Sequence, residues 1–178
     1  MRVTNETTAD LRTVRVLRFP LKISARTTQH FDEVMREFAL ISMDTDRERE
    51  QSDSQRLVPA RLLALVDELT KNFAAFTAAV TADRDEAAAR GDEEIDLTYR
   101  IPAAAAMACR ELKALLDEVD VFCQSGRYLI TLSTPPDSLA FRQWYLGEFI
   151  AQIDEDREPV PWPEYVAEHH AAADWAKV

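Results

Sequence analysis

Hydrophobic residues recur at helical spacing in four stretches of the chain. The stretches are residues 24–41, 59–80, 102–122 and 139–153. In each of them apolar side chains return every three or four residues and therefore fall on one face of a helix. Pro59 and Pro102 stand at the first turns of two stretches, where proline is favoured because its missing N–H costs nothing. The pattern predicts four main helices, each with one buried face.

Three shorter segments have the pattern of β-strands. Residues 95–101 alternate apolar and polar side chains, residues 13–23 are β-rich and cationic with Pro20 near their end, and residues 128–133 form a third short segment. Arginines and a proline suit an edge strand. Because the helix at 102–122 separates two of these strands, we expect one parallel, right-handed βαβ unit. The predicted fold class is α/β, bordering on α+β, with the helices covering a small mixed three-stranded sheet in two layers.

The chain divides into a domain and a tail. With 178 residues in all and 47% apolar content, residues 1–153 suffice for a single domain with one hydrophobic core. Within this domain residues 42–58 are polar, charge-dense and without periodicity, which is typical of a mobile loop. Residues 154–178 combine three prolines with two tryptophans. This composition predicts an extended strip followed by a short helix.

Glycine is scarce, with three in the chain against about twelve at average usage. Loops that cradle phosphate depend on glycine, because only glycine lets the backbone approach an anion so closely. The scarcity therefore disfavours such loops. Gly91 follows a basic helix end and predicts a C-terminal cap. Gly147 lies inside the helix at 139–153, where glycine costs about 1 kcal/mol, and we expect close packing against a neighbour.

Acidic residues outnumber basic ones. The chain has 32 acidic and 21 basic side chains and a formal charge of −11, which opposes binding to nucleic acid and to anionic membranes. No apolar run approaches the roughly 18 residues of a membrane span, and the N-terminus lacks the apolar segment of a signal peptide. We expect a cytoplasmic protein with neither nucleic acid nor membrane as partner.

The two cysteines, Cys109 and Cys123, fall in one predicted helix. At about 1.5 Å rise per residue they lie roughly 21 Å apart, too far for a disulfide, and both fall on the same apolar face. Buried structural thiols are therefore favoured over a nucleophilic Cys123. The histidines, His30, His169 and His170, lack metal-ligand spacing. The sequence predicts no metal and no cofactor.

One candidate ligand site lies at the carboxyl ends of the strands in the expected βαβ unit, where helix N-termini point their free N–H groups. Its residues combine arginines with hydroxyls and are Arg100, Ser133, Thr134, Ser138 and Arg142. Ser138 would cap the helix at 139–153, and Arg142 would lie in its first turn. Together they could receive a small anion or an acidic side chain of a partner. The alternative is that they are ordinary caps and surface arginines.

The segment from Leu65 to Asn72 resembles the Glu-x-x-x-Asn box of anti-sigma-factor kinases and related ATPases. In that family the glutamate activates water or substrate and the asparagine holds Mg²⁺, so the resemblance implies these roles for Glu68 and Asn72. The family also has an Asp-x-Gly-x-Gly loop and a glycine-rich lid, and this chain has neither. The structural alternative leaves both side chains in solvent beside the apolar stripe.

Three segments spread over the chain resemble a family of uncharacterised actinobacterial proteins. They are MREFALI (35–41), DLTYRIP (96–102) and FRQWYLGEF (141–149). Proteins of that family accompany partner-switching regulators of sigma factors, so the resemblance implies a regulatory role in bacterial signalling. None of the three segments contains a catalytic signature, and helix or strand packing also explains each of them.

Aromatic residues concentrate near the C-terminus. In the tail, Trp162, Tyr165 and Trp175 are the candidate partner contacts, because aromatic side chains around a proline-braced strip are typical of contact surfaces. Docking of the tail on its own domain is favoured over docking on a second copy, which would make a homo-oligomer.

The function expected from these observations is a non-catalytic regulatory or protein-interaction module whose partner is another protein. An enzyme is the alternative. It would be either a kinase-like protein that uses Glu68 and Asn72 on a nucleotide, or one that binds a small anion at Arg100 and Arg142.

Overall fold

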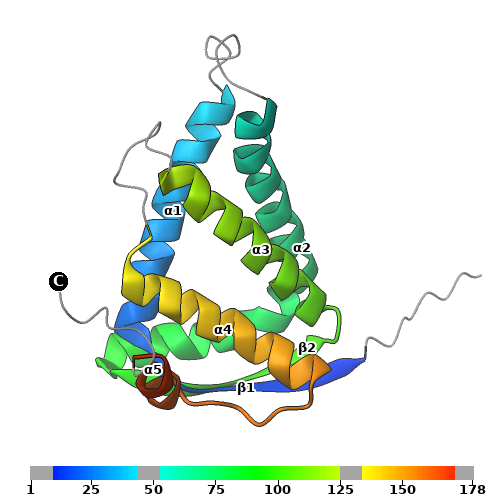
Figure 1. The fold of residues 1–178 in the computed structure, drawn as a ribbon. Helices are drawn as coiled ribbons and strands as arrows, with labels where there is room; N and C mark the ends of the chain where they lie inside the picture. The colour runs from blue at the N-terminus through cyan, green and yellow to red at the C-terminus, as the bar shows by residue number, and fades with distance from the viewer. Residues whose placement is uncertain (1–9, 44–52, 125–133, 171–178) are drawn as a thin grey trace, which may run out of the picture.

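The computed structural model describes residues 10–43, 53–124 and 134–170, and Figure 1 shows their arrangement. The elements in chain order are β1 (Leu11–Pro20), α1 (Leu21–Met43), α2 (Asp53–Arg90), β2 (Glu94–Pro102), α3 (Ala105–Gln124), α4 (Pro136–Asp154) and α5 (Trp162–His170). Helices dominate, and a small sheet lies along one side of them (Figure 1). The predicted combination of several helices with a small sheet is confirmed at this coarse level.

The sheet of the described residues has two strands, β1 and β2, which pair antiparallel. The predicted three-stranded sheet with a parallel βαβ unit is therefore wrong. β1 and β2 are joined by α1 and α2, which run away from the sheet and back again (Figure 1), so the chain re-enters the sheet in the reverse direction. The third predicted strand, residues 128–133, lies outside the described residues.

Alternation along the strands decides which face of the sheet is buried. Val14 and Val16 on β1 lie opposite Tyr99 and Leu97 on β2, and these side chains are at most 5% exposed. The residues between them on both strands are exposed. The predicted alternation over residues 95–101 is confirmed, and the sheet presents one face to the helices and the other to solvent.

α2 begins earlier than the sequence predicts. It starts at Asp53, so that Pro59 lies inside the helix rather than in its first turn. α1 extends to Met43. Both ends of the predicted loop at 42–58 are therefore helical. The cost of Pro59 is the loss of one backbone hydrogen bond, because its nitrogen has no hydrogen for the carbonyl of residue 55.

The C-terminal cap of α2 is confirmed. Gly91 has φ +84°, a left-handed conformation that glycine adopts without steric cost. The N–H groups of Gly91 and Asp92 donate to the carbonyls of Ala88 and Ala87 at 3.0 and 3.1 Å. These two bonds form a Schellman motif, which satisfies the last carbonyls of the helix and turns the chain into β2.

Two hydrophobic clusters hold the layers together. The first joins the inner face of the sheet to α4 and to the C-terminal part of α2, through residues such as Val80, Ala87, Phe141 and Trp144. The second joins α1, α2, α3 and α4, through residues such as Phe38, Leu62, Leu116 and Leu146. None of the described helices combines the length and the apolar character needed to cross a bilayer.

The segment after α4 packs on the chain's own domain. The indole Nε1 of Trp144 donates to the Val160 carbonyl at 2.8 Å, and the Val160 N–H donates to the Glu148 carboxylate at 3.2 Å. The Trp162 ring lies 6.0 Å from that of Phe141 and 5.3 Å from that of Trp144. Side chains of α4 therefore bind both backbone groups of Val160. The segment that contains Val160 runs back along the sheet to α5 (Figure 1).

Gly147 has open space where a Cβ would lie, because no neighbouring atom is within 4 Å of that position. The predicted close packing at Gly147 is therefore wrong. α4 contacts the rest of the core through large side chains such as Phe141 and Trp144, and the Cβ position of Gly147 lies outside these contacts.

Candidate functional site

The predicted anion-site residues do not all converge. Arg100 lies near the end of β2, which leads into the start of α3, whereas Arg142 on α4 contacts Asp117 and Asp120 near the end of α3. The length of α3 separates the two arginines. The expected convergence depended on parallel strand ends, and the described sheet is antiparallel. Ser133 lies outside the described residues.

Arg142 is the centre of a compensated ion-pair cluster. Its side chain is 10% exposed, and its Nη2 lies 3.1 Å from Asp117 and 2.5 Å from Asp120. Thr134 Oγ1 donates to Asp120 at 2.7 Å. The structure thus brings Thr134 and Arg142 together around Asp120. Two carboxylates already offset the positive charge of the arginine, so the cluster ties α4 to α3 and leaves little attraction for a small anion.

Ser138 lies within α4 and does not cap it. The N-cap residue is Pro135, and no side chain donates or accepts a capping bond there. The helix starts earlier than predicted because Pro136 fits the first helical position. Ser138 is 1% exposed, and its Oγ has no hydrogen-bond partner.

The candidate partner contacts in the tail are partly covered by the domain. Trp162 and Tyr165 are half-buried, and their rings stack with centroids 6.0 Å apart. Tyr165 also stacks on His169 at 3.8 Å. Trp175 lies outside the described residues. A role of these aromatic side chains in binding a partner stays a prediction.

Both cysteines are free thiols in environments that disfavour the thiolate. Burial raises the pKa of Cys109 to about 12 and the pKa of Cys123 to about 11. Thiols with such pKa values are protonated near neutral pH, and the thiolate is the nucleophile. Within the described ranges no group of three or more His, Cys, Asp or Glu side chains is placed to hold a metal ion.

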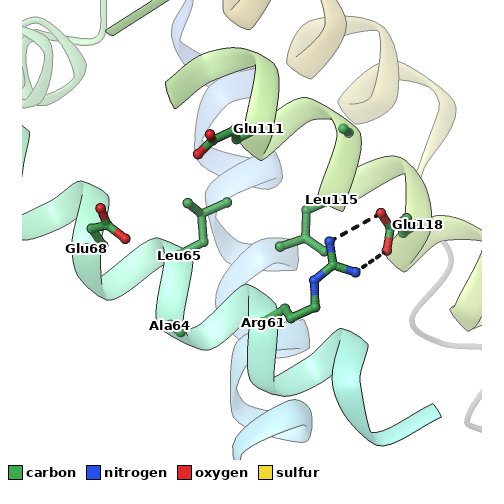
Figure 2. A pocket seen from close by; sticks show the side chains of 8 residues that line it. Arg61, Ala64, Leu65, Glu68, Glu111, Leu115 and Glu118 are labelled. Carbon is green, nitrogen blue, oxygen red and sulfur yellow. Dashed lines mark hydrogen bonds and ion pairs between the residues drawn. The ribbon is translucent and has the colours of Figure 1, made fainter. Parts of the chain in front are cut away.

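A groove of about 440 Å³ runs between α2 and α3. Figure 2 shows Leu65 and Leu115 between the two helices, with charged side chains at both ends. At one end Arg61 Nη1 lies 2.7 Å from Glu118 Oε2. At the other end Glu68 on α2 faces Glu111 on α3 (Figure 2). The groove is therefore apolar in the middle, neutralised at one end and acidic at the other.

The two sides of the groove have similar sequences. Residues 61–68 read RLLALVDE and residues 111–118 read ELKALLDE. In both segments the first, fourth, fifth and eighth residues line the groove, as expected for one face of a helix. The helices run antiparallel here, so the first residue of one segment faces the eighth residue of the other.

This arrangement explains the difference between the two ends. The first residue is Arg61 in α2 but Glu111 in α3. Arg61 neutralises Glu118, whereas Glu111 adds a second carboxylate opposite Glu68. No ion pair joins Glu68 or Glu111 to any cation of the described residues. Reasoning on single motifs missed Arg61, Glu111 and Glu118, and the similarity of the two octapeptides is the sequence signal that finds them.

Glu68 and Asn72 have different surroundings in the structure. Both side chains are exposed on α2, and Glu68 lines the groove. Asn72 lies one turn further along the helix and is not among the residues that line this groove. Within the described part of the chain, the structure shows no contact of either side chain that bears on a nucleotide site. The roles implied by the kinase resemblance stay predictions.

A second cleft of about 600 Å³ lies among α1, α2 and α3 on a different face of α2. None of its lining residues is charged. They are Phe31, Val66, Leu69, Thr70, Phe73, Ala74, Thr77, Ala78, Thr81 and Leu112. The hydroxyls of Thr70 and Thr77 donate to the Val66 and Phe73 carbonyls of their own helix. The cleft is therefore uncharged and mostly apolar.

Comparison of the chain with models of protein families, with curated proteins and with solved structures gives no match.

Proposed function

We propose that this protein is a non-catalytic regulatory module that binds a cationic amphipathic segment of another protein in the groove between α2 and α3. The proposal rests on two carboxylates that have no ion-pair partner among the described residues. Arg61 neutralises Glu118 at one end of the groove, while Glu68 and Glu111 face each other at the other end without a counterion among the described residues. A lysine or arginine of the partner would lie between these two carboxylates.

The centre of the groove supports an amphipathic ligand. Leu65 and Leu115 line it together with the small side chains of Ala64 and Ala114. A helix carries apolar residues and a cation one turn apart on the same face. Such a helix would place its apolar residues on the leucines and its cation between the glutamates. Burial of its apolar side chains would favour binding, and the loss of translational, rotational and side-chain freedom on association would offset part of that gain.

The charge of the whole chain favours the same class of partner. A formal charge of −11 attracts cationic proteins and speeds their association, and salt weakens this effect. The lining residues of the groove include no Ser, Cys, His or Lys that would act as a nucleophile. This composition supports binding over catalysis at this site.

The test is affinity capture from the native host with quantitative mass spectrometry. Wild-type bait should recover a defined partner that Glu68→Lys and Glu111→Lys baits lose, because each variant places a cation where the partner's cation would lie. Asp83→Lys is the matched control, since it makes the same charge change at an exposed position of α2 outside the groove. Recovery of the partner at equal levels by all baits, or of background proteins only, would refute the proposal.

The kinase-like alternative has its own discriminating measurement. Thermal-shift assays with ATP and Mg²⁺ should give no stabilisation if the groove binds a protein segment. A stabilisation by ATP and Mg²⁺ that Glu68→Ala abolishes would instead support nucleotide binding.

A further inference from the structure

The backbone groups of β2 alternate between two directions. The Ala103 N–H donates to the Asp10 carbonyl at 2.9 Å, and the Leu21 N–H donates to the Glu93 carbonyl at 3.1 Å. In an antiparallel pair the bonded residues alternate with residues whose N–H and C=O point away from the partner strand. The odd-numbered residues of β2 therefore bond to β1, and the even-numbered residues direct their backbone groups outward.

The outer edge of β1 is protected. The side chain of Gln152 accepts from the Arg15 N–H at 2.9 Å and donates to the Arg15 carbonyl at 2.8 Å. A bulge between Val16 and Phe19, with Arg18 at φ 52°, interrupts the same strand. Side-chain bonds and bulges are devices that stop a further strand from adding to an edge.

Among the described residues, neither a bulge nor a side-chain bond of this kind protects the outer edge of β2. Its outward backbone groups at Asp96, Thr98 and Arg100 form no hydrogen bond with any other described residue. All three residues are exposed. An exposed strand with unpaired N–H and C=O groups is a template for the addition of another strand.

The sequence of β2 is complementary to itself in the antiparallel direction. If a two-fold axis passes through Thr98, each Asp96 faces Arg100 of the second copy, and each Leu97 faces Tyr99 of the second copy. Asp96 and Arg100 lie on the solvent face, where opposite charges across two strands are stabilising. The Arg100 side chain has no acidic partner among the described residues, and Asp96 Oδ1 accepts the Arg18 N–H at 2.7 Å, leaving Oδ2 for the arginine.

We infer that β2 is a dimerisation edge, on which β2 of a second copy pairs antiparallel about Thr98. The two sheets then form one sheet of order β1–β2–β2–β1, and each facing pair of outward residues exchanges both of its backbone hydrogen bonds. Because the contact is self-complementary it closes after two copies. This surface is separate from the groove between α2 and α3, so the inference stands independently of the proposed function.

The test is sedimentation of the full chain over a range of concentrations. The wild-type mass should rise from 20.2 kDa towards twice that value. Thr98→Pro should abolish the rise, because it removes an outward N–H of the edge without removing a bond to β1. Thr13→Pro is the matched control on the outer edge of β1 and should dimerise like the wild type. Circular dichroism checks that both variants remain folded.

Charge exchange and cross-linking test the register. Arg100→Asp should raise the dissociation constant of the dimer roughly tenfold or more, and adding Asp96→Arg in the same chain should restore it. Thr98→Cys should form an intermolecular disulfide, since facing residues of bonded pairs have Cα atoms about 5.5 Å apart, and Thr13→Cys should not. A wild type that stays monomeric at every concentration, or a dimer that persists in Thr98→Pro, would overturn the inference.

Discussion

Glu68 on α2 faces Glu111 on α3 across a groove in which the equivalent opposite end is closed by the Arg61–Glu118 ion pair. The two ends are lined by equivalent positions of two similar octapeptides on antiparallel helices. They differ in charge because the first position is arginine in α2 and glutamate in α3. The acidic end of the groove is therefore a local exception in a nearly symmetric arrangement.

The first prediction follows from this symmetry. Glu111→Arg should give Glu68 the same kind of partner that Arg61 gives Glu118. Because both positions are exposed, the gain in the free energy of unfolding should be small, about 0.2–1 kcal/mol, and should shrink with added salt. Urea denaturation at two salt concentrations measures it. A lower stability of the variant at low salt would show that the two glutamates do not face each other closely enough to matter.

A second prediction concerns Gly147. An alanine there meets no neighbouring atom within 4 Å and removes the entropic cost of glycine inside a helix. Gly147→Ala should therefore stabilise the protein by roughly 0.5–1 kcal/mol. Thermal and urea unfolding measure this change. Destabilisation would mean that the backbone of α4 lies closer to another element than the structure places it.

Glu148 makes a third prediction, on pH dependence. Burial raises the pKa of this carboxyl above its ordinary value, although hydrogen bonds from Gln152 and Val160 partly oppose the shift. A carboxyl whose pKa is higher in the folded state than in the unfolded state binds its proton more readily when the protein is folded. Its protonation therefore stabilises the folded state as the pH falls from the pKa of the folded state to that of the unfolded state.

Glu148→Gln isolates this effect from the other carboxyls. Its amide oxygen keeps an acceptor for the Val160 N–H but does not titrate. The difference in the free energy of unfolding between the wild type and Glu148→Gln should move in favour of the wild type as the pH falls from 7 to about 4. Urea denaturation across this range gives the difference. A difference that moves in the opposite direction would mean that the ionised carboxylate is stabilised in its site.

The thiols supply a fourth prediction. Cys109 and Cys123 have pKa values raised to about 12 and about 11, so both should resist alkylation at pH 8 in the folded protein and react fully in urea. Mass spectrometry after treatment with iodoacetamide counts the modified sites. Rapid modification of Cys123 in the folded state would revive its alternative role as a nucleophile.

Some local patterns in the sequence predict local structure correctly, whereas the helix start expected at Pro59 and the cap expected at Ser138 are wrong. The alternation of Ile95 to Ile101 identifies β2, and Gly91 identifies the end of α2, because both signals depend only on nearby residues. The pairing of β1 with β2 is different. It brings together two strands that α1 and α2 separate in the sequence. The residues within each strand do not determine which strand it pairs with or whether the pairing is parallel or antiparallel.

The candidate site shows the same limit. The prediction of an anion site at Arg142 and Ser138 depends on the ends of parallel strands, and the strands of the described sheet are antiparallel. The carboxylates that surround Arg142 come from α3, and only tertiary packing reveals them. The groove between α2 and α3 is predictable in part, since the two octapeptides share their pattern, but their facing arrangement comes from the packing of two helices.

The proposed function requires the acidic end of the groove to bind a cation of an amphipathic helix. Its most direct test is the affinity of a fluorescent model helix of leucine and lysine, measured by anisotropy against the wild type and two variants of equal net charge. Glu68→Lys with Glu111→Lys should weaken binding at least roughly tenfold. Asp83→Lys with Glu86→Lys, at exposed positions of α2 outside the groove, should weaken it far less. Equal losses in both variants would mean that the peptide follows net charge alone, and the groove would then not be its binding site.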